Sequence, residues 1–147
     1  MSTQTLFIFN TTILTTPSLS YDSEIIDVEQ ARRIVKHFRG PIVSAVGHQA
    51  TAEIAALLLD HPVPMSRIAA EQRPGDRAIC IKLRQRAPEG VVLTREQVEE
   101  IGYDLVMLDA VDPATRRKTI RDLESVAHLL ASPDDQAALD AEAALTP

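Results

Sequence analysis

Segments typical of β-strands alternate with segments typical of α-helices along this chain, and this order restricts the possible folds most strongly. Runs of β-preferring residues lie at 6–9, 42–46 and 103–108, and the stretches between them carry apolar residues at helical spacing. Neighbouring parallel strands need a crossover connection, which is usually a helix. The sequence therefore predicts an α/β fold, a compact domain with a mixed β-sheet flanked by helices.

The same patterns predict the remaining elements. Apolar residues three and four apart indicate a helix at 28–38 with Asp27 as its N-cap, and residues 24–27 are expected to form a short strand. Further helices are expected at 49–59 and at 113–130. A short helix is expected to begin after a capping box of Thr94 and Gln97 and to end at about residue 100. At 147 residues the chain fits one domain, which we place at residues 1–130, followed by an acidic tail at 131–147.

Apolar and basic residues alternate over the segment 77–86. Its large aliphatic residues share one face of the expected strand, and the opposite face carries Cys80 with three cations, Lys82, Arg84 and Arg86. Side chains on one strand face stand roughly 6.5–7 Å apart, similar to successive phosphates on an extended backbone. This row is therefore a candidate phosphate-binding surface, and a solvated strand face is the alternative.

The charge and composition restrict the partners. The formal net charge is −6, aromatic residues make up 3% of the chain and Trp is absent. Binding of duplex nucleic acid needs a broad cationic face, and single strands need aromatic stacking platforms, so neither is expected. Residues 61–90 nevertheless carry six Lys or Arg against three Asp or Glu. Such a local excess suits a small, compact polyanion.

The expected compartment follows from cysteine and apolar content. One cysteine, Cys80, cannot form an internal disulfide, which fits a reducing environment. No apolar stretch approaches the about 20 residues that a membrane-spanning helix needs, and the first basic residue is Arg32. We therefore expect a cytoplasmic protein with neither a membrane span nor a secretory signal.

The strongest local signal for a site is the strand-turn-helix unit V-S-A-V-G-H-Q-A-T-A at residues 43–52. Gly47 allows a tight turn, and the start of the following helix directs unpaired N–H groups and a partial positive charge at a cleft, which suits a phosphate. His48 stands there, and an imidazole with an ordinary pKa of about 6.5 can donate a proton to a phosphate-ester oxygen. The alternative is that His48 only caps the helix.

Motifs for metals and common cofactors are missing from the sequence. The four histidines are scattered without an H-x-x-x-H pair, and there is no second cysteine, so no metal site is expected. The sequence also has no P-loop and no G-x-G-x-x-G motif, and we expect no cofactor.

Four motifs, in this order and spacing, resemble a known family. They are F-N-T-T-I-L-T at residues 9–15, V-S-A-V-G-H-Q-A-T-A at 43–52, V-P-M-S-R-I at 63–68 and L-R-Q-R-A-P-E-G-V-V-L-T at 83–94. The sequence is similar there to the viral ring nucleases that act as anti-CRISPR proteins against type III systems, and to their bacterial relatives. The resemblance covers about residues 6–108.

The resemblance implies a small α/β domain that forms a two-fold homodimer with cyclic tetra-adenylate bound across the interface. It implies metal-independent cleavage to linear di-adenylates with 2′,3′-cyclic phosphate ends, which switches off type III CRISPR signalling. By motif position, His48, Arg86 and Glu89 match the catalytic residues of the family. Together with the turn and the basic row, the expected substrate-binding residues are Asn10, Thr12, Gly47, Arg67 and Lys82.

Two other functions stay open. A protein that only sequesters the cyclic nucleotide would use the same cleft without turnover. A transcriptional or interaction module would use the acidic C-terminal helix instead. Product analysis in the presence of EDTA separates the first alternative from cleavage, and a gel shift or pull-down detects the second.

Overall fold

A computed structural model describes residues 3–130 of the chain. The strands are β1 (Leu6–Phe9), β2 (Ser20–Ile26), β3 (Ile42–Ser44), β4 (Arg77–Leu83) and β5 (Tyr103–Val111). The helices are α1 (Val28–His37), α2 (Gln49–Leu59), α3 (Arg95–Ile101) and α4 (Pro113–Leu130). The chain divides into two compact units, Met1–Asp112 and Pro113–Pro147. The expected domain of residues 1–130 thus spans the first unit and α4, and the expected acidic tail lies outside the described residues.

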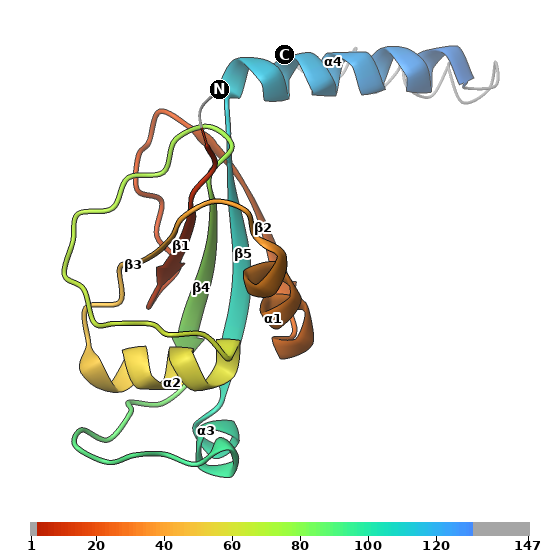
Figure 1. Ribbon diagram of the computed structural model, residues 1–147. Helices are drawn as coiled ribbons and strands as arrows, with labels where there is room; N and C mark the ends of the chain where they lie inside the picture. Colours follow the sequence, from red (N-terminus) through yellow and green to blue (C-terminus); the bar gives the residue numbers. More distant parts are fainter. Residues whose placement is uncertain (1–2, 131–147) are drawn as a thin grey trace. The chain divides into compact units, whose positions relative to one another are not determined.

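The five strands form one mixed sheet in the order β2-β5-β4-β1-β3, which confirms the predicted α/β class (Figure 1). β1 runs parallel to both of its neighbours, with Leu6 opposite Ile42 of β3 and opposite Arg77 of β4. β5 runs antiparallel to β4 and to β2. Because β1, β3 and β4 are parallel, the residues that follow all three strands emerge at the same edge of the sheet.

Each face of the sheet carries a buried hydrophobic cluster. One face packs against α1, α2 and α3, with Leu6, Ile79 and Leu58 among its fully buried residues. The other face carries a smaller cluster around Phe7, Phe9 and Cys80, in which the two phenylalanine rings stack with centroids 5.6 Å apart. The expectation of a basic opposite face on β4 is therefore wrong at Cys80, which is 0% exposed.

The amino ends of β1 and β4 are joined by a buried carboxylate. Asp76 is 3% exposed and accepts hydrogen bonds from the backbone N–H groups of Thr5 at 3.0 Å and Arg73 at 2.8 Å. The neighbouring Gln72, also buried, donates to the carbonyl oxygen of Leu108 at 3.2 Å. These bonds satisfy backbone groups that would otherwise be unpaired. They lie at the edge of the sheet where the parallel strands begin.

The helix starts follow the predicted local chemistry. Asp27 caps α1 and Thr94 caps α3, each in a reciprocal capping box with the residue three positions on, Gln30 and Gln97. Gly102 has a φ of +77°, a conformation that other residues rarely adopt, and it turns the chain from α3 into β5. The predicted N-cap at Asp27 and the predicted capping box at Thr94 are confirmed, and α2 has the predicted bounds.

Four strands differ from their predicted extents, among them β5, which extends to Val111 beyond the predicted end at residue 108. β2 is longer than expected because a seven-residue antiparallel register with β5 supplies its hydrogen bonds, although most of its residues are exposed. β3 ends at Ser44, whose hydroxyl accepts a hydrogen bond from the N–H of Val46 and so replaces a ladder partner. β4 ends at Leu83, so Arg84 and Arg86 do not share a strand face with Lys82, contrary to prediction.

The second unit is described only through α4, an 18-residue helix without a buried residue. Among the residues that the structure describes, no helix is long and apolar enough to cross a membrane.

Candidate functional site

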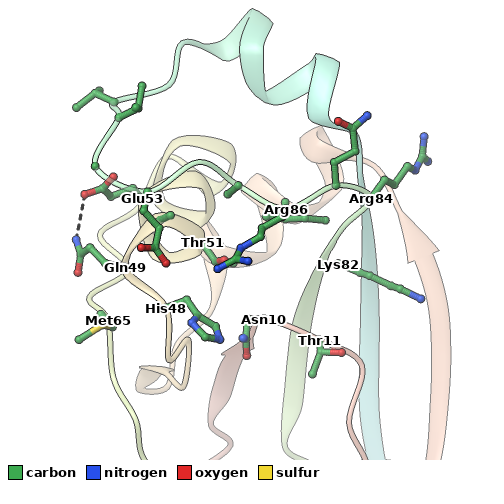
Figure 2. A pocket seen from close by; sticks show the side chains of 18 of the residues that line it. Asn10, Thr11, His48, Gln49, Thr51, Glu53, Met65, Lys82, Arg84 and Arg86 are labelled. Carbon is green, nitrogen blue, oxygen red and sulfur yellow. Dashed lines mark hydrogen bonds between the residues drawn. The ribbon is translucent and has the colours of Figure 1, made fainter.

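A pocket of about 970 Å³ lies at the carboxyl edge of the parallel strands (Figure 2). Its wall comes from the loop after β1, the first turns of α2, residues 65 and 67, and the segment from the end of β4 to residue 92. In α/β sheets this edge is the usual place for a ligand, because the loops that follow parallel strands converge there. Six of the expected site residues line it, namely Asn10, His48, Arg67, Lys82, Arg86 and Glu89.

Two expected binding residues are not among those that line the pocket. Thr12 is exposed in the loop after β1, and its neighbour Thr11 lines the pocket instead. Gly47 lies directly before His48 and contributes through its backbone, because its carbonyl oxygen accepts a hydrogen bond from Arg67. The structure thus brings most of the expected residues together and replaces one threonine by another.

His48 occupies the N-cap position of α2 with an extended backbone, and its side chain makes no capping hydrogen bond. Figure 2 shows its ring directed into the same hollow as the guanidinium group of Arg86. N-cap side chains are usually short oxygen acceptors that bond to the next turn. The alternative that His48 only caps the helix is therefore wrong for its side chain, which remains available to a ligand.

The turn that carries His48 is fixed by three successive contacts with the segment after α2. The hydroxyl of Ser44 donates to the carbonyl of Pro64 at 2.6 Å, and the N–H of Ser66 donates to the carbonyl of Val46 at 2.8 Å. The third contact is the bond from Nε of Arg67 to the Gly47 carbonyl at 3.1 Å. These contacts lead from a buried residue of β3 directly to the backbone before the histidine, so its position is set by the fold.

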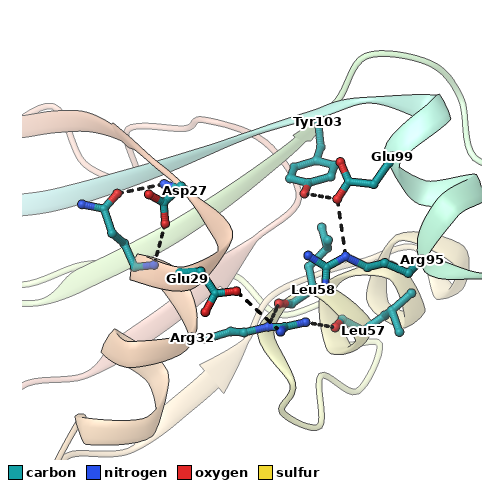
Figure 3. Close-up of polar contacts among 9 residues, drawn as sticks. Asp27, Glu29, Arg32, Leu57, Leu58, Arg95, Glu99 and Tyr103 are labelled. Carbon is teal, nitrogen blue, oxygen red and sulfur yellow. Dashed lines mark hydrogen bonds and ion pairs between the residues drawn. The ribbon is translucent and has the colours of Figure 1, made fainter.

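The far end of α2 is held by α1, as Figure 3 shows. Nε of Arg32 donates to the carbonyl of Leu58 at 2.8 Å, and its terminal nitrogen donates to that of Leu57 at 3.3 Å. A cation at the last carbonyl groups also complements the partial negative charge of a helix C-terminus. The helix that presents His48 is thus anchored at both ends.

The three cations after Ile81 diverge instead of forming a row. Arg84 donates to the carboxylate of Asp104 at 2.8 Å, and this bond holds the pKa of the Asp104 carboxyl below its usual value. In Figure 2 Lys82 and Arg84 point away from the guanidinium group of Arg86. The pocket wall still contains four Lys or Arg against Glu53 and Glu89. It therefore carries a net positive charge in a chain whose formal net charge is −6.

Three further lining residues, Gln49, Thr51 and Met65, lie within the quoted motifs but are not among the expected site residues. Gln49 and Thr51 belong to the first turn of α2, and Met65 precedes the Arg67 segment. Nε2 of Gln49 donates to the Glu53 carboxylate at 3.1 Å, on the same wall. The spacing of polar residues along the start of α2 was the available signal, because residues three and four apart share one helix face.

Within residues 3–130, no group of three or more His, Cys, Asp or Glu side chains is arranged to hold a metal ion.

The fold and the pocket define an α/β protein with a ligand-sized, positively charged hollow at the carboxyl edge of a mixed sheet. The family model described as STIV B116-like matches residues 6–105, and the chain belongs to this family.

Relatives come from viruses and from a bacterium. Protein ORF117 of Acidianus two-tailed virus is 34% identical over 109 residues, which are 72% of this chain and 93% of the viral protein. Protein YddF of Bacillus subtilis strain 168 is 30% identical over 103 residues, 70% of this chain and 94% of the relative. The structure of B116 from Sulfolobus turreted icosahedral virus superposes with a TM-score of 0.59 at 17% identity, over 72% of this chain and 98% of B116. This last similarity concerns the fold.

Proposed function

We propose that this protein is a ring nuclease that opens cyclic tetra-adenylate without a metal ion and thereby ends type III CRISPR signalling. The observation that carries the proposal is the placement of His48 at the start of α2, without a capping bond, in a pocket that also contains Arg86 and Arg67. The four sequence motifs that resemble the ring nucleases supply all the lining residues of that pocket except Glu53 and Lys82.

The size and charge of the pocket suit a cyclic oligonucleotide. About 970 Å³ lies at the upper end of the range of about 300–1,000 Å³ that is usual for ligand pockets. Four phosphates in a ring are a compact polyanion, and the cations of the wall would offset their charge. The first N–H groups of α2 have no side-chain cap and are further donors for phosphate oxygens.

Cleavage needs few protein groups because the nucleophile belongs to the ligand. The 2′-hydroxyl of a ribose attacks its own 3′-phosphate and releases its proton to solvent, the P–O bond to the next 5′-oxygen breaks, and a 2′,3′-cyclic phosphate forms. In this mechanism His48 donates a proton to the departing 5′-oxygen, and Arg86 stabilises the charge on the phosphoryl oxygens. Glu89 would orient Arg86 or accept a ribose hydroxyl. The remaining contribution of the site is to hold ribose and phosphate in line.

A two-fold homodimer fits this substrate. A ring of four equivalent nucleotides has a two-fold axis, so a symmetric pair of subunits would present two copies of His48 to opposite phosphates. Two cuts would then yield two linear di-adenylates. Because such a signal is produced inside the cell, we propose the cytoplasm as the place of action.

Product analysis tests the proposal directly. Purified protein is incubated with cyclic tri-, tetra- and hexa-adenylate, each with and without EDTA, and the products are separated by liquid chromatography with mass detection. We expect di-adenylate with a cyclic phosphate end from the tetra-adenylate, in both conditions. Tight binding without products would indicate a sequestering protein, and the absence of both binding and products would reject the proposal.

A further inference from the structure

The helix α4 lies beyond the family match, which ends at residue 105. It carries an apolar stripe at spacings of three and four, made of Ile120, Leu123, Ala127 and Leu130. Ile120 is 46% exposed and Leu123 is 64% exposed. In proteins, most of the stability of a helix comes from packing such an amphipathic face rather than from helix propensity. We therefore expect the stripe to pack against an apolar partner.

The spacing of the stripe is that of a helix pair. Steps of three, four and three residues are the a and d positions of a heptad repeat, which pack into the same positions of a second helix. Ile120 and Leu123 lie at equal distances from the middle of α4. In an antiparallel pair centred there, Ile120 of each helix faces Leu123 of the other across a two-fold axis, and Ala127 of each helix faces Arg116 of the other.

The charges of α4 favour the same arrangement. Residues 113–121 contain four Lys or Arg and no acid, whereas residues 122–130 contain two acids and no Lys or Arg. A parallel pair would place the four cations of one helix beside the four of the other. An antiparallel pair places each basic half beside an acidic half, and like charges across an interface are unfavourable.

We propose that α4 pairs antiparallel with α4 of a second copy of this chain. Arg117 and Glu124 flank the stripe at equivalent heptad positions, seven residues apart and both exposed. In the antiparallel pair Arg117 of each chain lies beside Glu124 of the other, which gives two equivalent ion pairs at the edges of the contact. This interface is independent of the proposed nuclease activity.

Paired cysteines test both the contact and its direction. The double variant Arg117→Cys/Glu124→Cys cannot bridge within one chain, because seven helical residues span about 10 Å and a disulfide needs Cα atoms within about 7 Å. The protein is mildly oxidised, and free thiols are alkylated before denaturation. We expect the double variant to give at least ten times as much covalent dimer as either single variant. Ser125→Cys, on the outer face of the helix, is the matched control.

Charge reversal provides a second measurement without cysteines. Arg117→Glu is expected to raise the dissociation constant in sedimentation experiments about tenfold, and addition of Glu124→Arg is expected to restore it. Equal cross-linking of the double and single variants, or charge reversals that do not compensate each other, would overturn the proposal. Because neither residue lines the pocket, these outcomes are separable from any loss of ring binding.

Discussion

Nε of Arg67 lies 3.1 Å from the carbonyl oxygen of Gly47, the residue directly before His48. Arg67 therefore contributes to the site in two ways. Its charge forms part of the pocket wall, and its Nε–H group fixes the backbone that aims the histidine. The two contributions can be separated by substitution, because lysine keeps the charge but has no equivalent of the Nε–H group.

Arg67→Lys and Arg67→Ala should therefore differ in binding and agree in rate. We expect the lysine variant to bind cyclic tetra-adenylate within about threefold of the parent, whereas the alanine variant binds at least tenfold more weakly. Both should cleave about tenfold more slowly in single-turnover assays, since the Gly47 carbonyl loses its donor in each. A lysine variant with the parent rate would show that only the charge of Arg67 matters.

His48→Ala should slow cleavage by about 10²–10⁴-fold, which is the usual contribution of a general acid. Affinity for the ring should change little, because the imidazole acts mainly on the departing oxygen. Single-turnover cleavage and equilibrium binding measure the two effects. His37→Ala, in the last turn of α1 and outside the pocket wall, is the control and should retain the parent rate. Parent-like cleavage by His48→Ala would remove the histidine from the mechanism.

Arg86→Ala and Arg84→Ala form a matched pair two residues apart. The guanidinium group of Arg84 is engaged by Asp104, whereas that of Arg86 points into the hollow (Figure 2). Loss of Arg86 should weaken ring binding by about 1.5–3 kcal/mol, the contribution typical of charge-assisted hydrogen bonds. Loss of Arg84 should cost less than a third of that amount. Binding titrations at two salt concentrations decide, and equal losses would contradict the assignment.

Asp76→Ala should destabilise the fold by about 2–3 kcal/mol. The carboxylate is buried and accepts from two backbone N–H groups, which the substitution would leave without an acceptor. Urea unfolding followed by circular dichroism measures the change in the free energy of unfolding. Glu71→Ala, an exposed carboxylate five residues earlier, is the control and should stay within about 0.5 kcal/mol of the parent.

Stability should fall at alkaline pH because of Cys80. Burial raises the pKa of its thiol from 9.0 to about 11. Because the folded-state pKa lies above the unfolded value, the contribution of the buried thiol to the free energy of unfolding is complete below pH 9. It is lost as the pH rises toward 11. Two pKa units correspond to about 2–3 kcal/mol. Urea unfolding at pH 8 and pH 11 should show a smaller decline for Cys80→Ala than for the parent, and equal declines would contradict this origin.

Local signals in the sequence predicted the parts of the fold that depend on local physics. The N-cap at Asp27, the capping box at Thr94 and the bounds of α2 follow from residues a few positions apart. The extent of β2 could not be predicted in this way, because its polar residues form a strand only through pairing with β5, whose paired residues lie 79 to 91 positions away. The end of β4 was also missed, since alternation continues through Arg86 while the ladder stops at Leu83.

The site was predictable where a motif carried it. His48 follows β3, and Arg86 and Glu89 follow β4. These residues come together because both strands run parallel to β1, and the predicted alternation of strands and helices already implied parallel neighbours. The choice of Thr11 over Thr12 was not predictable, because one residue in a loop is directed by tertiary contacts rather than by spacing. The divergence of Arg84 from Arg86 depends on Asp104 in another strand.

At position 48, the residue that would best stabilise the start of α2 differs from the residue that the proposed chemistry needs. Serine, aspartate or asparagine there would accept a bond from the next turn and would gain about 0.5–2 kcal/mol of stability. Variants selected only for resistance to heat should therefore drift toward these residues and lose the imidazole. A thermostable form of this protein is then best sought elsewhere in the chain, with the histidine held fixed.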